Sequence, residues 1–165
     1  MRGRFRSERG AELIEMMLVT PILLLIFAAI FDFAVMFRGW ETVTNAAREG
    51  ARVASLPAFS TDEDVRARVE QYMQAAGLAN ACTTAVVAGT SCPVANTAGA
   101  CAVCVKPQSI NTPSGGVFSA RSVTVMYRQA LPTLSGVSPL LGGASFGMVP
   151  IGSTSLMRTE APASP

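Results

Sequence analysis

One uninterrupted apolar stretch constrains the fold of this chain more than any other feature. From Met16 to Phe37, 22 residues, the only charged side chain is Asp32. An α-helix of that length rises about 33 Å, enough to cross the roughly 30 Å of hydrocarbon in a bilayer. A secretory signal peptide has a shorter apolar core followed by a small-residue cleavage site, and the segment FRGWETVT that follows here has no such site. The sequence therefore predicts a membrane-spanning helix.

The charge distribution predicts how that helix is oriented. The first ten residues contain four arginines and one acid, whereas residues 11–165 contain nine bases and ten acids. By the positive-inside rule, the N-terminus stays in the cytoplasm and the rest of the chain is exported. The near-neutral remainder also lacks the basic face that binding to a nucleic acid requires, so no nucleic-acid partner is expected.

Composition gives no support to catalysis. The chain has no histidine, which removes the usual general base at neutral pH and the commonest metal ligand. It also has no glycine-rich phosphate-binding motif. We therefore expect no enzymatic activity, no cofactor, no metal and no small-molecule substrate.

The helix is expected to continue well beyond the membrane. It should end near Ser55, before Pro57, which makes it about 68 Å long from Ala11. Past the membrane, apolar and small residues recur at alternating steps of four and three, as in a helix that packs along one narrow stripe. The predicted packing residues are Met36, Trp40, Val43, Ala47, Gly50, Ala51 and Ala54. Two partners for this stripe stay open: the chain's own globular part and other subunits.

A short motif precedes the apolar stretch. A basic leader ends at Gly10, and Glu15 is the fifth residue after that glycine. Cleavage between Gly10 and Ala11 would create an α-ammonium group, and Glu15 would pair with the ammonium group of a neighbouring subunit. Such pairing lowers the free-energy cost of placing both charges at a membrane edge. Pro21, inside the same helix, removes a backbone donor and favours a kink.

As a set, these residues resemble the N-terminal signature of the TadE-like pseudopilins, minor components of the bacterial tight-adherence (Tad, or Flp) pilus machinery. The resemblance covers about residues 9–55. It rests on Arg9, Gly10, Glu15, Pro21, Asp32 and the block Ala47-Arg48-Glu49-Gly50-Ala51-Arg52. Met16 follows Glu15 where a major Flp pilin has Tyr, and the chain is far longer than such a pilin. Both differences favour a minor component.

The resemblance implies a location, partners and a domain plan. It implies cleavage after Gly10 by a prepilin peptidase, retention in the inner membrane and a part in pilus assembly. Other pseudopilins and the pilus assembly platform would be the partners, and Glu15, Pro21 and Asp32 would serve assembly. The expected divisions are a leader at 1–10, a transmembrane and extended helix at 11–56, and a periplasmic domain at 57–165.

The exported part predicts a small α+β domain, with a helix on an antiparallel β-sheet. In FSTDEDVRARVEQYMQAAGLAN, Ser60 and Glu63 fit a capping box and Gly77 suits the stop of a helix. Its expected inner face consists of Val65, Val69, Tyr72, Met73 and Ala76. Short strands are expected at 84–89, 101–106, 122–129 and 153–158.

The segment 132–152 is expected to be a long loop. Its apolar residues are Leu140, Leu141, Phe146, Met148 and Val149. We favour a place for them in the core, and the alternative is a mobile or partner-binding loop.

Four cysteines lie in the exported part, where disulfides persist. They are Cys82, Cys92, Cys101 and Cys104. Nested pairing, Cys82 with Cys104 and Cys92 with Cys101, would suit an antiparallel hairpin. A redox motif at Cys101 and Cys104 should open a helix, and a four-cysteine zinc site usually has two close pairs. Structural disulfides are therefore preferred. Two functional alternatives stay open: a plain membrane-anchored binding domain and a membrane-tethered thiol oxidoreductase.

Overall fold

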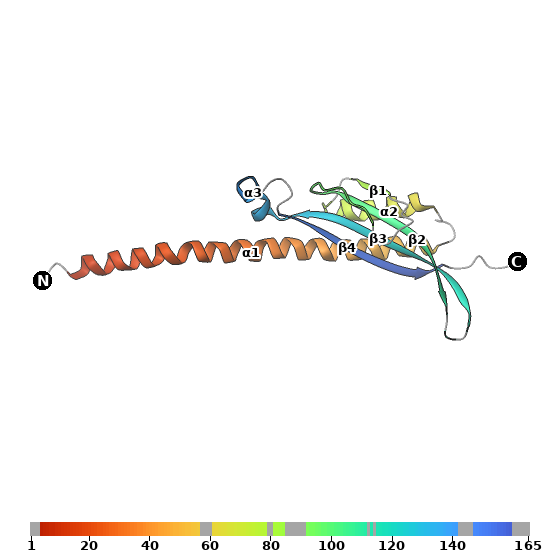
Figure 1. Cartoon of the computed structure of the whole chain (residues 1–165), viewed down its shortest axis with the longest axis horizontal. Coiled ribbons are helices and arrows are strands. Elements are labelled where there is room, and N and C mark those ends of the chain that lie inside the picture. The colour runs from red at the N-terminus through yellow and green to blue at the C-terminus, as the bar shows by residue number, and fades with distance from the viewer. Residues whose placement is uncertain are drawn as a thin grey trace.

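A single long helix organises the molecule. The computed structural model describes residues 4–56, 61–78, 81–84, 92–111, 113, 115–141 and 147–159. Helix α1 (Arg4–Ser55) runs alone for its first half and then enters a small domain (Figure 1). Its C-terminal end at Ser55 confirms the prediction. Its N-terminal end lies upstream of Ala11, so the part of the leader that the structure describes is helical too.

Four strands form one mixed sheet in the order β1-β2-β3-β4. They are β1 (Cys82–Thr84), β2 (Cys101–Asn111), β3 (Val117–Ala130) and β4 (Met148–Arg158). Strand β3 is antiparallel to both β2 and β4, as predicted, whereas β1 runs parallel to β2. The 16 residues between Thr84 and Cys101 exceed the dozen or so that a parallel connection needs. The connection is therefore long enough to join β1 and β2 as parallel strands and not as a tight hairpin.

The strands begin and end differently from the predicted ranges. The predicted 101–106, 122–129 and 153–158 lie inside β2, β3 and β4, each of which is longer than expected. Strand β1 begins two residues before the predicted 84–89, most of which lies outside the described residues.

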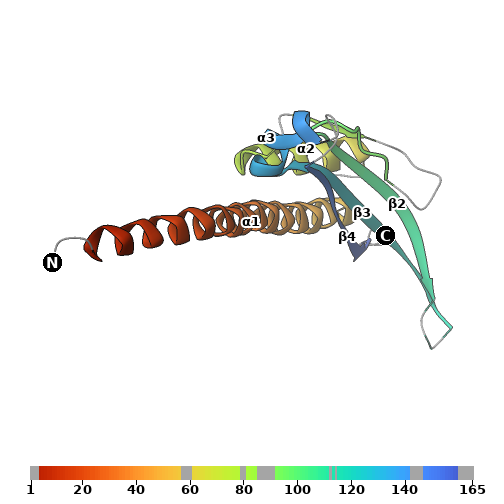
Figure 2. The ribbon, with the colours of Figure 1, turned by 60° about the vertical axis from the view of Figure 1, so that its left-hand side comes forward.

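The C-terminal half of α1 forms the centre of the core. It lies along the sheet, against β3 and β4, and α2 (Asp62–Ala75) packs beside it (Figures 1 and 2). The predicted stripe is buried here: Val43, Ala47 and Ala51 are fully buried, and Ala54 is 2 % exposed. Trp40, by contrast, is 50 % exposed. The stripe therefore docks on the chain's own domain, the first of the two partners left open by the sequence.

Gly50 allows the close approach of α1 to its neighbours. A Cβ atom at this position would lie 2.7 Å from Val69 Cγ2 and 3.1 Å from Val123 Cγ1. Real Cβ contacts are almost never that short, so a glycine is needed where α1 crosses α2 and β3.

The start of α2 corrects one prediction. The N-cap is Thr61, whose side chain accepts a hydrogen bond from the backbone N–H of Asp64 at 3.2 Å, and Ser60 lies outside the described residues. Gly77 ends the helical segment with a φ of 71°, as expected. Val65, Val69 and Met73 are buried as predicted, but Tyr72 is 37 % exposed. Because α2 packs mainly on α1, only a narrow stripe of it is covered.

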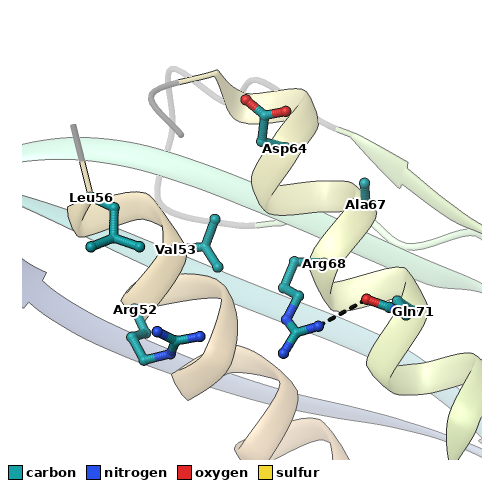
Figure 3. Close-up of a pocket in the computed structure, with 7 residues that line it drawn as sticks. All are labelled: Arg52, Val53, Leu56, Asp64, Ala67, Arg68 and Gln71. Atoms are coloured by element: carbon teal, nitrogen blue, oxygen red, sulfur yellow. Dashed lines mark hydrogen bonds between the residues drawn. The ribbon is translucent and has the colours of Figure 1, made fainter. Parts of the chain in front are cut away.

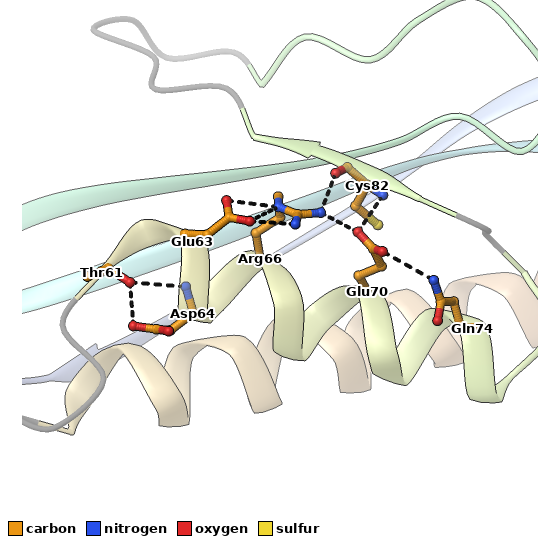
Figure 4. Close-up of polar contacts among 7 residues, drawn as sticks. All are labelled: Thr61, Glu63, Asp64, Arg66, Glu70, Gln74 and Cys82. Atoms are coloured by element: carbon orange, nitrogen blue, oxygen red, sulfur yellow. Dashed lines mark hydrogen bonds and ion pairs between the residues drawn. The ribbon is translucent and has the colours of Figure 1, made fainter.

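The polar face of α2 holds the edge strand β1 (Figure 4). Arg66 forms ion pairs with Glu63 and Glu70 and donates a hydrogen bond to the Cys82 carbonyl at 3.1 Å. Glu70 in turn accepts a hydrogen bond from the backbone N–H of Cys82 at 3.1 Å. Both backbone groups of Cys82 are therefore bound by charged side chains of α2, which fixes the short strand.

The segment after β3 is a helix and not the predicted loop. Helix α3 (Pro132–Leu141) follows β3, and β4 begins at Met148. Met148 and Val149 are half-buried. Phe146, and the side chains of Leu140 and Leu141, lie outside what the structure describes.

The cysteines form two disulfides, but not in the nested pairing. Cys82 is bonded to Cys101, and Cys92 to Cys104. The nested pairing assumed a hairpin, whereas Cys82 and Cys101 are register partners on parallel strands. The expected absence of a Cys101–Cys104 bond is confirmed. Both residues lie within β2, each bonded to a different partner, so the paired thiols of an oxidoreductase motif are not present.

Candidate assembly surface

The N-terminal half of α1 projects from the domain as an uncovered apolar rod (Figure 1). Its large apolar side chains, from Leu13 to Phe31, are 49–79 % exposed. Soluble monomers rarely expose a continuous apolar surface of this size, so lipid or other helices must cover it. Among the described residues, α1 is the one helix long and apolar enough to cross a membrane. This finding supports single-pass membrane anchoring.

The predicted processing and pairing residues lie at the free end of this rod. At Gly10, an added Cβ atom would meet no atom within 4 Å. Glu15 is exposed and lies four residues after Ala11, one helical turn along the same face. In the part of the chain that the structure describes, no group pairs with the Glu15 carboxylate, which leaves it open to a partner outside the chain.

Pro21 lies inside the rod without ending the helix. Proline lacks the N–H that would bond to the carbonyl of Met17. On the preceding turn, the Thr20 hydroxyl donates to the Met16 carbonyl at 2.6 Å. Transmembrane helices tolerate such an interruption because neighbouring groups satisfy freed backbone atoms.

Asp32 marks the point where the rod meets the domain. It is 4 % exposed, and it is the first buried residue met along α1 in the part whose side chains are described. Its carboxylate accepts hydrogen bonds from the backbone N–H groups of Thr133 at 3.0 Å and Leu134 at 3.2 Å, and from the Thr133 hydroxyl. These N–H groups belong to the first turn of α3. Asp32 therefore caps α3 from a distant part of the sequence.

The sequence marks Asp32 as the one charged residue of the apolar stretch, but nothing near Asp32 or Pro132 in the sequence indicates this contact. Pro132 is typical of the first position of a helix, yet the residues just before it, Ala130 and Leu131, offer no side-chain acceptor. The cap comes instead from α1, about a hundred residues earlier. A proline followed by apolar residues at steps of three was the one local signal for this helix.

Three aromatic side chains form a stripe next to Asp32 on α1. Phe33, Phe37 and Trp40, here called the aromatic stripe, are 62 %, 46 % and 50 % exposed. The ring centroids of Phe33 and Phe37 are 6.4 Å apart, and those of Phe37 and Trp40 are 5.9 Å apart. The stripe lies on a surface of α1 that the domain leaves uncovered.

Comparison with known protein families finds a match for most of helix α1. The model of the TadE-like protein family matches residues 10–52. This segment is TadE-like. The searches of curated proteins and of solved structures find no match to the chain. The match confirms the resemblance seen in the sequence and supports a protein associated with the Tad pilus system. It takes in both the exposed rod and most of the part of α1 that is buried in the domain.

The TadE-like segment ends beside a groove between α1 and α2 (Figure 3). The groove has a volume of about 670 Å³ and is lined by Arg52, Val53, Leu56, Asp64, Ala67, Arg68 and Gln71. Its two arginines both donate to the Glu49 carboxylate, each with a shortest distance of 2.8 Å. These hydrogen bonds lower the pKa of Glu49 to about 2. The single Glu49 carboxylate therefore offsets one of the two positive charges, and the network ties α2 to α1.

Proposed function

We propose that this protein is a minor pseudopilin that takes part in assembly of a Tad/Flp-type pilus at the bacterial inner membrane. One observation carries the proposal. The TadE-like match at residues 10–52 falls on a helix whose first half is an exposed apolar rod and whose second half is the core of its own domain. Such a helix offers its membrane half to other subunits while it presents a folded domain on the other side.

The proposed topology places the leader in the cytoplasm and the domain in the periplasm. A prepilin peptidase removes residues 1–10 by cutting between Gly10 and Ala11. The open space around Gly10 supports this step, because no packed group would have to move for a peptidase to reach it. The two disulfides suit an oxidising compartment such as the periplasm.

Assembly then uses the exposed half of the helix. Residues 11–31 pack beside equivalent helices, and the Glu15 carboxylate pairs with the α-ammonium group of Ala11 in a neighbour. Pairing is favoured because both charges lie at the end of an apolar rod, where an unpaired charge is costly. The burial of Val43, Ala47 and Ala54 within the domain directs subunit contacts to the membrane half of the helix.

The first test determines the N-terminal residue of the native protein extracted from membranes. We expect intact mass and N-terminal sequencing to give Ala11. The matched variant Gly10→Leu changes a position with no packed neighbours, so it should keep the fold and retain the leader. An intact Met1 on the wild-type protein, in cells with an active prepilin peptidase, would favour the alternative of a plain membrane-anchored binding domain.

The second test separates assembly from anchoring. Glu15→Gln removes the charge with little change of shape, and Glu12→Gln makes the same change three residues earlier on the same exposed segment. We expect Glu15→Gln to reduce site-specific cross-linking between membrane helices of pilus subunits, and Glu12→Gln to leave it near the wild-type level. Equal cross-linking in all three proteins would refute the pairing role of Glu15.

A further inference from the structure

Helix α3 occupies the end of the domain that faces the exposed rod. In Figure 1 it is the domain element closest to the N-terminal half of α1. The hydrogen bonds from Thr133 and Leu134 to Asp32 fix its first turn against α1. Its position relative to the rod is therefore set by contacts and not only by the connection to β3.

The height of α3 along the rod matches the surface of a membrane. The segment from Ala11 to Phe31 contains 21 residues, and its charged side chains, Glu12 and Glu15, lie near the free end of the rod. The segment rises about 32 Å, against a hydrocarbon thickness of roughly 30 Å. Asp32 follows directly. If the rod spans the hydrocarbon, the start of α3 lies where hydrocarbon gives way to lipid headgroups.

The chemistry of α3 suits that layer. Residues 129–157, which include all of α3, contain no charged side chain. Leu134 and Val137, three residues apart on one face of α3, are 38 % and 41 % exposed. Apolar side chains on an uncharged helix at a membrane surface lose contact with water when they enter the boundary between headgroups and acyl chains.

The aromatic stripe lies at the same level on α1. Phe37 and Trp40 come five and eight residues after Asp32, about 8 and 12 Å further along the axis. Because helix side chains tilt toward the N-terminus, both rings lean back toward the membrane. Aromatic residues, Trp above all, are enriched at this interface.

We propose that α3 and the aromatic stripe form a membrane-surface contact, in which Leu134, Val137 and Trp40 insert into the headgroup layer on the domain's side of the bilayer. The occupant of this face is lipid and not a second protein chain. The contact would restrict the tilt of the domain over the membrane. It rests on the membrane anchoring of α1 and not on the pilus role.

Depth-dependent fluorescence quenching tests this contact in the full chain, reconstituted into phosphatidylcholine–phosphatidylglycerol vesicles. All four native cysteines are in disulfides, so a single added cysteine can be labelled with an environment-sensitive fluorophore. The labelled variants are Val137→Cys in α3, Val117→Cys at the far β2–β3 hairpin and Leu24→Cys in the rod, all at exposed positions. Quenching is compared for lipids with a nitroxide in the headgroup and lipids with a nitroxide deep in the acyl chain.

We expect the headgroup nitroxide to remove roughly half of the fluorescence at position 137 and very little at position 117, as for a residue buried in the interface. Position 24 should respond mainly to the deep nitroxide. Strong quenching at 24 with equal, weak quenching at 137 and 117 would overturn the contact while leaving the anchoring intact. Weak quenching at all three positions would refute the anchoring itself.

A second measurement needs no substitution. Trp40 is the only tryptophan in the chain, so lipids brominated near the headgroup should quench its native fluorescence more than lipids brominated near the chain end. No quenching by either lipid would exclude the aromatic stripe from the membrane surface. Quenching that depends on protein density, but not on bromination, would assign this face to a second copy of the chain and overturn the proposal.

Discussion

Removing the Asp32 carboxylate should loosen α3 without unfolding the domain. Asp32→Ala deletes the acceptor of two backbone hydrogen bonds, at 3.0 and 3.2 Å, and of the bond from the Thr133 hydroxyl. Loss of a helix N-cap costs about 1 kcal/mol, and hydrogen bonds to a charged group contribute about 1.5–3 kcal/mol. Because water replaces part of this interaction at a membrane surface, we expect the free energy of local opening of α3 to fall by about 2 kcal/mol.

Hydrogen exchange measured by mass spectrometry gives that free energy directly. A change of about 2 kcal/mol corresponds to roughly 30-fold faster exchange of α3 amides. Peptides from β2 and β3 should exchange at the wild-type rate, because α3 packs mainly against α1. Asp32→Asn keeps an oxygen acceptor in place and should show less than half of the free-energy change. Unchanged exchange in α3, or equal acceleration throughout the domain, would refute the capping role.

Three other substitutions or measurements test the packing of the domain. Gly50→Ala should lower the melting temperature by about 5 °C, because overpacking costs about 1–3 kcal/mol and the gain in helix propensity returns only about 1 kcal/mol. Glu49→Gln should destabilise the protein by about 1–2 kcal/mol at pH 7, an estimate that allows for solvent screening of its half-exposed arginines. Since the folded-state pKa of Glu49 is about 2, against a usual 4.5, the difference between wild type and variant in denaturant titrations should shrink as the pH falls from 4.5 toward 2. Proteolytic mapping without reduction should recover peptides joined as Cys82–Cys101 and Cys92–Cys104, whereas peptides joined as Cys82–Cys104 would contradict the structure.

Local sequence patterns correctly predicted the helices and strands that are specified by residues near them in the chain. The end of α1 near Ser55 follows from the approach of Pro57, and the buried stripe along α1 follows from its alternating spacing of small residues. The positions of β2, β3 and β4 follow from short β-branched runs between turn residues. Each of these signals lies within the element that it specifies or directly beside it.

Features that depend on distant contacts were missed. Helix α3 has its cap on Asp32, a hundred residues away, so its own segment read as a loop. Strand β1 is held parallel to β2 by Arg66 and Glu70 of α2, a contact that the spacing of the strands does not reveal. The predicted disulfide pairing was wrong because it assumed an antiparallel hairpin, whereas β1 and β2 are parallel. At the assembly surface, the sequence marked Asp32 as an unusual acid but could not show what it binds.

The continuity of α1 determines what assembly can do to the domain. No linker separates the exposed rod from the buried stripe, because one helix runs from Arg4 to Ser55. At Asp32 the rod is also joined to α3, so the domain is attached to the helix from the first buried residue onward. A rotation or axial shift of the rod within a helical bundle must therefore move the domain with it as one body.

If Glu15 sets the register of the rod, it also sets the height of the domain above the membrane. A shift of one helical turn would displace α3 by about 5.4 Å. That displacement is comparable to the depth of the headgroup layer, so a slip in register would remove α3 from the proposed lipid contact. Register in the membrane and the seating of the domain on its surface are thus two consequences of one continuous helix.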